Sequence, residues 1–228
     1  MVMDFVVFKG MSFFEAAPRM YQYIHQLFKS CHHCGRWDGR PSLYCICCEN
    51  LLWKTHPAVS VDWVQDIRVS YLFHWVPDSD RQVSRLLLSL KGGRPQSAIQ
   101  FYCEQFLARA EICGDLRNSI LVPCPSHRGR DHALVLAEEF SKVLDIPVHL
   151  ALERASDPGQ QRRLDLRSRE KIRFKSCSNL REKHVIFIDD IVTTGATVMA
   201  ARRAMKGISG FEVWTLARRR LLAPDLTL

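Results

Sequence analysis

The sequence lacks any apolar stretch long enough to cross a membrane, because no run approaches the roughly 20 uninterrupted apolar residues of a spanning helix. Its start also lacks the features of an export signal: "MVMDFVVFKGMSFF" carries an acidic residue where basic ones are needed, and Lys9 interrupts the apolar part. No internal repeat, low-complexity tract, GxxxxGK(S/T) or GxGxxG motif occurs, which argues against repeat folds, P-loops and dinucleotide-binding fingerprints. Together these absences predict a folded protein that works in the cytoplasm.

The composition is that of an ordinary folded chain with a surplus of positive charge. The 228 residues allow one good-sized domain, or one domain plus a small satellite. A hydrophobic fraction of 47% and a charged fraction of 25% are typical of soluble globular proteins. The net charge of +8 favours an anionic partner, either nucleic acid or a phosphorylated small molecule. A basic surface without such a role is the alternative.

Cysteine is plentiful, with nine residues, but the odd count and the missing export signal favour reduced thiols or metal ligation over disulfides. There are two CxxC pairs with ten residues between them, and they are Cys31 with Cys34 and Cys45 with Cys48. Each pair is expected to form a tight knuckle, and four thiolates would complete a closed, structural Zn²⁺ site. Unligated core cysteines are the alternative, and His32, His33 and Cys47 lie close enough to compete as ligands.

Alternating helical and strand patterns follow the cysteine segment. We expect a first unit over residues 1–60, which holds a helix over 12–28 and the cysteine module, and a second unit over residues 61–228. In the second unit the patterns predict helices over 80–91, 96–113, 131–144 and 196–207, and strands over 67–75, 119–123, 147–152, 184–189 and 211–217. This alternation predicts an α/β fold, a parallel sheet with helices on both faces.

The stretch "HVIFIDDIVTTGATV" places two adjacent carboxylates, Asp189 and Asp190, at the expected carboxyl end of a buried strand. Ligands of parallel sheets bind at that end, and the small-residue loop before the next helix is a ready anion site. The carboxylates would repel a phosphate, so we expect them to accept hydrogen bonds from sugar hydroxyls or to hold Mg²⁺. An acidic helix cap is the alternative, but a cap needs one carboxylate. A phosphate site beside carboxylates indicates a ribose phosphate.

The segment "VIFIDDIVTTGAT" resembles the motif with which type I phosphoribosyltransferases bind phosphoribosyl pyrophosphate (PRPP), although Phe187 is bulkier than the family usually has. The resemblance implies that Asp189 and Asp190 are the catalytic residues that hold the ribose hydroxyls, with Mg²⁺ stabilising the leaving group. It also implies a loop that holds the 5′-phosphate, made of Thr193, Thr194, Gly195, Ala196 and Thr197.

Two basic segments supply candidates for the pyrophosphate side of such a site. The turn in "ILVPCPSHRGRDHA" offers His127, Arg128 and Arg130, and arginine suits bidentate contact with phosphate. The segment "QQRRLDLRSREKIRFK" is either a solvated helix face or a lid that closes over an anion. Its place directly before the strand at 184–189 favours the lid.

These features together resemble the ComF family, which joins a zinc ribbon-like module to a phosphoribosyltransferase-like domain and is linked to DNA uptake in natural transformation. The resemblance runs from Cys31 to about Arg218 and adds Lys91 of "LLLSLKGG" and Arg169 of "QRRLDLRSR" to the pyrophosphate side. Two departures concern catalysis more than the fold. "RGRDHALVLA" lacks the family's Phe-Asn-Gln, and Ile172 stands where an asparagine is usual.

The resemblance leaves two functions open. The first is a competence protein that binds single-stranded DNA and also binds PRPP with Mg²⁺, with other DNA-uptake proteins such as a helicase as implied partners. The second is an active phosphoribosyltransferase that transfers phosphoribosyl to a nucleobase or another nucleophile. The candidate DNA-binding residues are Arg36, Arg40, Lys54, Arg162, Arg163 and Arg167. Three aromatic residues would either stack on bases or pack the module against the larger domain, and these are Trp37, Tyr44 and Trp53.

Overall fold

A computed structural model of the chain describes residues 30–37, 42–77, 79–91, 96–112, 116–126, 131–155 and 173–219. The helix expected over 12–28 lies outside these residues, as does most of the basic segment 160–175. Within the part of the chain that the structure describes, no helix combines the length and the apolarity that crossing a membrane requires.

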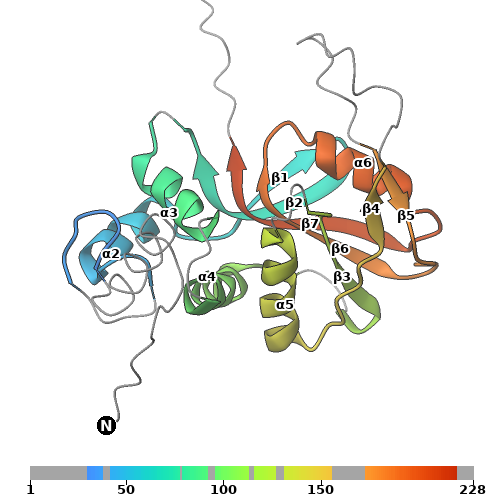
Figure 1. Ribbon diagram of the computed structural model, residues 1–228, viewed down its shortest axis with the longest axis horizontal. Coiled ribbons are helices and arrows are strands. Elements are labelled where there is room, and N and C mark those ends of the chain that lie inside the picture. Colours follow the sequence, from blue (N-terminus) through green and yellow to red (C-terminus); the bar gives the residue numbers. More distant parts are fainter. Residues whose placement is uncertain are drawn as a thin grey trace, which may run out of the picture.

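A five-stranded sheet forms the centre of the molecule, with strand order β1-β2-β7-β6-β3 (Figure 1). The strands are β1 (Ser60–Val64), β2 (Ile67–Trp75), β3 (Ser119–Pro123), β6 (His184–Val192) and β7 (Gly210–Arg219). Strand β1 pairs antiparallel with β2, and all other pairs are parallel. The carboxyl ends of β2, β7, β6 and β3 therefore meet at one edge of the sheet, which is where ligands of parallel sheets bind.

Helices cover one face of the sheet, and these are α3 (Arg81–Lys91), α4 (Gln96–Arg109) and α5 (His132–Leu144). The other face carries α6 (Ala196–Ala204) and a hairpin of β4 (Leu152–Arg154) and β5 (Phe174–Ser176). Helix α2 (Ile46–Thr55) lies at one end of the molecule beside α3 (Figure 1). A short 3₁₀ turn (Leu116–Asn118) precedes β3.

Strand β6 shows why the sequence folds this way. Its residues Val185 and Phe187 pack against the α6 side, whereas Ile186 and Ile188 pack against the side of α3, α4 and α5. A strand buried on both faces needs such an unbroken apolar run, which is typical of parallel sheets covered by helices. On the neighbouring strand Trp214 is 2% exposed and fills the centre of the larger core.

The predicted α/β class, a mainly parallel sheet with helices on both faces, is confirmed. The strands predicted at 67–75 and 119–123 match β2 and β3 residue for residue. The strand predicted at 147–152 is wrong, because only Val148 forms an isolated bridge, with Leu121, while Leu152 begins β4. The side chains of His149 and Leu150 are exposed, so the segment lacks the alternating buried side chains of a strand that packs in the sheet.

Strand β6 is longer than predicted and does not end on the two aspartates. It continues to Val192, because β7 extends beside it and pairs Ile191 with Ala217 and Val192 with Arg218. On the other side β3 stops earlier, with Pro123 paired to Ile188. The carboxylates therefore lie inside β6, at the point where one neighbouring strand has ended and the other has not.

Candidate metal centre and candidate anion site

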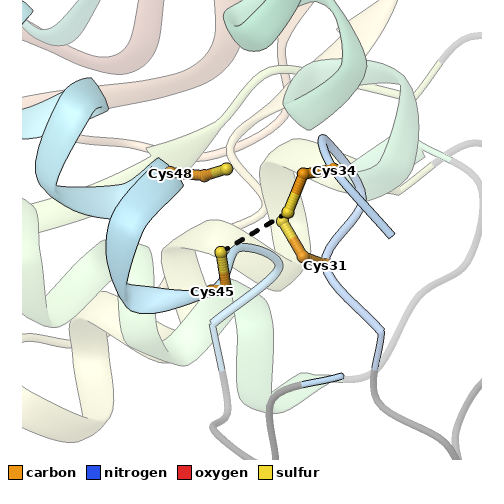
Figure 2. Close-up of side chains that lie close together, drawn as sticks. All are labelled: Cys31, Cys34, Cys45 and Cys48. Atoms are coloured by element: carbon orange, nitrogen blue, oxygen red, sulfur yellow. Dashed lines mark hydrogen bonds between the residues drawn. The ribbon is translucent and has the colours of Figure 1, made fainter. Parts of the chain in front are cut away.

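Four cysteines lie together beside α2 and form the candidate metal centre (Figure 2). The sulfur atoms of Cys31, Cys34, Cys45 and Cys48 all lie within 4.8 Å of one another, and the pair Cys34 and Cys45 is 3.6 Å apart. Tetrahedral Zn²⁺ with about 2.3 Å bonds to sulfur places its ligands about 3.8 Å from one another. Both the donor set and its spacing therefore fit Zn²⁺.

The first pair sits on a tight turn whose backbone bonds hold the two thiols on the same side. The carbonyl of Cys31 accepts a hydrogen bond from the N–H of Gly35 at 2.8 Å, and its own N–H donates to the carbonyl of Arg36 at 2.7 Å. Gly35 has a φ of 75°, a left-handed conformation that glycine adopts without strain. The N–H of His33 donates to the Cys31 sulfur at 3.4 Å, which would stabilise a thiolate there.

The second pair lies at a helix start instead of in the knuckle that we expected. Cys45 is the N-cap of α2 and Cys48 lies in its first turn. The N-terminus of a helix favours negative charge, so this position stabilises thiolates. A hydrogen bond from the backbone N–H of Cys48 is the main cause that lowers the pKa of the Cys45 thiol to about 7, whereas burial raises the pKa of Cys48.

The competing ligands point elsewhere. The Nδ1 atom of His32 lies 3.0 Å from the hydroxyl of Ser89, and the ring of His33 packs edge-on against Tyr44. The Cys47 thiol is exposed and accepts a hydrogen bond from Arg36 at 3.6 Å. Among the described residues, the four spaced cysteines alone form a group that could hold a metal ion.

Helix α3 fastens this module to the rest of the molecule through three side chains on one of its faces. Gln82 donates to the carbonyl of Cys48 at 2.6 Å, Arg85 donates to the carbonyl of His33 at 3.0 Å, and Ser89 bonds His32. Residues spaced three and four apart share a helix face, so α3 presents one polar row to the module. Its buried residues Leu86 and Leu90 belong to the core that also includes the buried cysteines.

Two of the three aromatic candidates pack the module against the larger unit. Tyr44 is buried and donates to the carbonyl of Gln82 at 2.5 Å, and Trp53 stacks on Phe73 under the guanidinium of Arg109. Trp37 is 69% exposed. Arg36 and Lys54 are also exposed. The other DNA-binding candidates lie outside the described residues, and these are Arg40, Arg162, Arg163 and Arg167.

The aspartate pair occupies the middle of the carboxyl edge of the sheet. Asp189 is 8% exposed and lies opposite Thr215 in the register, and Asp190 is half-buried. One oxygen of Asp189 accepts the N–H of Asp190 at 3.0 Å, and one oxygen of Asp190 accepts the N–H of Ile191 at 2.8 Å. Asp190 also borders a small apolar pocket of about 20 Å³, together with His132 of α5.

The loop after β6 leads into the N-terminus of α6. Gly195 is the N-cap of α6 and has a φ of 82°, and a Cβ atom there would lie 2.5 Å from a methyl carbon of Val64. Only glycine both adopts this positive φ without strain and has no Cβ to collide with Val64, so Gly195 allows the loop to pack closely on β1. Thr193 and Thr194 are exposed, as is Ala196, and Thr197 is half-buried. The loop thus presents hydroxyls and backbone N–H groups at a helix N-terminus, which favours an anion.

The loop after β3 faces the aspartates. The N–H of Cys124 donates to the carbonyl of Ile188 at 2.8 Å, so this loop begins beside the aspartates. Burial is the main cause that raises the pKa of Cys124, and the charge of Asp189 raises it further. Arg154 of β4 donates to the carbonyls of Pro125 and Ser126 at 3.1 and 3.2 Å and holds the loop in position. The predicted pyrophosphate-side residues lie outside the described residues or have no described side chain, and they are His127, Arg128, Arg130, Arg169 and Lys91.

Sequence reasoning missed Arg218 and Asp62. Arg218 donates from Nε to Asp62 at 3.0 Å and from a terminal nitrogen to the carbonyl of Thr193, so it ties the anion loop to β1. Partial burial raises the pKa of Asp62, but the bonds from Arg218 and from the Trp63 N–H outweigh it and lower the pKa below its ordinary value. The partners are 156 positions apart, and no local pattern links them.

The structure is that of an α/β protein with a four-cysteine cluster and a candidate anion site formed by a strand, a loop and a helix start. No family model and no curated protein matches the chain. Among solved structures, the chain is similar to an allosteric regulatory enzyme of purine biosynthesis (14% identity, TM-score 0.38), with 57% of this chain aligned to only 30% of that protein.

Two further solved structures are similar over most of their length. One is a purine phosphoribosyltransferase from Pyrococcus horikoshii Ot3, at 19% identity and a TM-score of 0.32, over 67% of this chain and 82% of that one. The other is an adenine phosphoribosyltransferase from Leishmania tarentolae, at 12% identity and a TM-score of 0.39, over 70% and 94%. At such identities and scores these are resemblances only.

Proposed function

We propose that the chain is a ComF-type protein that binds PRPP with Mg²⁺ at Asp189, Asp190 and the loop from Thr193 to Thr197, and that also binds single-stranded DNA. The observation that carries the PRPP part is the placement of both carboxylates beside a glycine-capped helix start, at the carboxyl edge of a parallel sheet. We further propose two units, residues 1–60 and 61–228, acting in the cytoplasm.

In this proposal the loop residues bind the 5′-phosphate through hydroxyls and backbone N–H groups, while Asp189 and Asp190 orient the ribose hydroxyls. Carboxylate oxygens are the ligands that Mg²⁺ prefers, so the donor set suits this ion. Mg²⁺, when bound, would neutralise charge on the pyrophosphate. The buried position of Asp189 strengthens any hydrogen bond it accepts, because little water competes there.

Calorimetric titration of PRPP with Mg²⁺ tests this site. Asp189→Asn together with Asp190→Asn keeps the shape of both side chains but removes their charge, and should weaken PRPP binding by at least tenfold. Asp66→Asn, in the exposed turn between β1 and β2, is the matched control and should bind PRPP as the wild type does. Unchanged affinity in the double variant would refute the proposed PRPP site.

The DNA-binding part is supported by three exposed residues of the module, Trp37, its sequence neighbour Arg36, and Lys54 of α2, and by the net charge of +8. Arg36→Gln with Lys54→Gln should reduce the salt slope of oligonucleotide binding by about 0.7 for each lost phosphate contact. The control is Arg117→Gln, at an exposed position in the 3₁₀ turn before β3, and it should leave the salt slope unchanged. Equal salt slopes in the wild type, the double variant and the Arg117 variant would exclude Arg36 and Lys54 as DNA-binding residues.

The second candidate function is an active phosphoribosyltransferase. An acceptor would approach the sugar at the carboxyl edge beside Asp189 and Asp190, although the small apolar pocket next to Asp190, about 20 Å³, has room for about one water molecule and not for a nucleobase. The departures from the family's motifs, at "RGRDHALVLA" and Ile172, favour binding without turnover. Release of pyrophosphate with any of a panel of nucleobases, lost in the double aspartate variant, would establish the enzyme.

A further inference from the structure

The small apolar pocket beside Asp190 lies between the sheet and the helices that cover it. Leucine and isoleucine side chains of α3, α4, α5 and β7 supply most of its wall. Among the described residues that line it, only His132 and Asp190 carry polar side chains. Its volume of about 20 Å³ is enough for one water molecule. A histidine and a carboxylate therefore share one small space in apolar surroundings.

The two aspartates of β6 face opposite sides of the sheet, because successive side chains of a strand alternate. Asp190 shares the face of Ile188, which packs towards α3, α4 and α5. Asp189 shares the face of Phe187, which packs towards α6. Asp190 therefore borders the pocket, and Asp189 does not line it.

His132 is the first residue of α5, and its side chain lines the pocket. The Nε2 atom of this ring is buried and has no hydrogen-bond partner among the described residues. A buried polar nitrogen without a partner is unfavourable, so we expect a group in the pocket to bond it. A water molecule both donates and accepts, and it therefore suits Nε2 in either ring tautomer.

Asp190 supplies the second polar contact that such a water needs. One carboxylate oxygen of Asp190 accepts the N–H of Ile191 at 2.8 Å. A further bond to a water held by His132 would fix the carboxylate at two points, and so set the direction in which its oxygens accept other bonds. The apolar wall keeps competing water away, which strengthens these bonds.

We propose that His132 is a positioning residue for Asp190, joined to it by one water molecule in the pocket. Held in this way, Asp190 keeps the orientation in which it accepts a hydroxyl of the ribose. This role towards the sugar rests on the proposed PRPP site, whereas the contact between the two residues does not. His132 bonds the carboxylate and not the sugar, so its effect on binding passes through Asp190.

The contact is tested on the full chain by the ring nitrogen resonances of His132, which are assigned by their loss in His132→Gln. Asp190→Asn removes the charge beside the pocket and should shift the Nε2 resonance. Asp189→Asn is the matched change on the opposite face of the same strand, and should shift it by no more than about a third as much. Equal shifts in the two variants, or none in Asp190→Asn, would overturn the inference whether or not PRPP binds.

The role towards PRPP is tested by calorimetric titration of PRPP with Mg²⁺. His132→Leu removes the hydrogen-bonding atoms and should weaken PRPP binding by about five- to tenfold. It should not lower the free energy of unfolding, because leucine leaves no buried nitrogen unpaired. His132→Gln places an amide near the position of Nε2 and should bind PRPP within about twofold of the wild type, whereas the shorter His132→Asn should not. The control is His149→Gln, at an exposed position, and it should bind as the wild type does.

A double variant separates this role from a merely structural one. In the Asp190→Asn background, His132→Leu should cause no further loss of PRPP affinity. The positioning role is overturned if His132→Leu binds PRPP as the wild type does, if His132→Gln fails to recover binding, or if the two losses add. A wild type that does not bind PRPP would overturn the proposed function and the role of His132 towards the sugar, and the resonance shifts would still decide the contact.

Discussion

The cysteine module and the sheet are held together in different ways, although their buried residues form one continuous core. In the module, residues 30–37 and 42–55, few large side chains are buried, and the four clustered thiols and a few backbone bonds are the main local contacts. In the sheet, order comes from large buried side chains such as Trp214, Phe106 and Phe140, whose rings lie 5.3 to 5.5 Å apart. One region should therefore depend on a metal and the other on packing.

The contrast extends to function. The module directs several polar contacts to α3, and Arg36, Trp37 and Lys54 are among its exposed residues. The candidate functional groups of the sheet instead lie at one edge, where β6 and β7 extend beyond β3. A substitution in either region should thus first reduce order in that region, and the loss of order elsewhere measures how strongly the two regions are coupled.

Loss of one zinc ligand should have the largest effect. Cys48→Ser removes a buried thiolate from a site whose metal contributes about 10 to 16 kcal/mol to such modules, so the module should lose both zinc and order. Metal analysis and amide exchange should show unprotected amides in α2 with β6 still protected. Cys47→Ser, one residue away and outside the four-sulfur cluster, should keep a full equivalent of zinc. Retained zinc in Cys48→Ser would disprove the assignment of ligands.

A cavity in the core of the sheet should have the second largest effect. Trp214→Ala leaves Phe106 and Phe140 without their partner and should lower the free energy of unfolding by about 3 to 5 kcal/mol, measured by denaturant titration. Trp37→Ala, at an exposed position, should change it by less than about 0.5 kcal/mol. If removing zinc from the wild type lowered the sheet's stability as much as Trp214→Ala does, the two regions would be one cooperative unit.

Glycine offers a matched pair across the two regions. Gly35 and Gly195 both have positive φ, but an added Cβ meets nothing within 4 Å at Gly35 and meets Val64 at 2.5 Å at Gly195. Gly35→Ala should cost about 1 kcal/mol from the backbone alone, seen as weaker zinc binding. Gly195→Ala should cost about 2 to 3 kcal/mol in unfolding free energy and weaken PRPP binding.

Val64→Ala makes room for the added methyl group and isolates the steric part of this effect. The double variant with Gly195→Ala should recover part of the lost stability, so that the two changes are not additive. Strict additivity would mean that backbone strain alone accounts for Gly195, and the close packing of the anion loop on β1 would then have no energetic role.

Much of this arrangement follows from the sequence, and what does not follow has a physical reason. The apolar run of β6 and the spacing of the two CxxC pairs are local signals, and they predicted the central strand and the sulfur cluster. The β4–β5 hairpin joins segments separated by a long basic stretch, so no short window reveals it. Helix α2 begins within a cysteine-rich segment that has little helical periodicity, and in the fold its residues Leu52 and Trp53 pack against the core.

The candidate site divides in the same way. The acids and the threonine loop were predicted because they are contiguous, whereas the clamp formed by Arg218 and Asp62 depends on strands that meet only in the folded sheet. The end of β6 was misplaced because two carboxylates usually mark the end of a buried strand. Here β7 provides backbone partners beyond them, so the strand continues.

The smallest expected effect concerns His56, which lies where the module meets the sheet. Burial is the main cause that lowers its pKa below 6.5, helped by the charge of His74, and this outweighs Asp80 at 3.8 Å, which raises it. The unfolded chain therefore binds a proton more readily than the folded one. Stability should be fully retained above about pH 6.5, should fall as the pH drops from there towards the lowered pKa, and should level off below it.

His56→Gln should remove this component, so that the free energy of unfolding falls less between pH 7.5 and pH 5 than in the wild type, by under about 1 kcal/mol. His149→Gln, at an exposed position, should leave the pH profile unchanged. If the profile of His56→Gln follows that of the wild type, protonation at this junction does not oppose folding. If amides of α2 lose protection before those of β6 as the pH falls, the junction opens from the module side, which is the order that a metal-held region beside a packed sheet predicts.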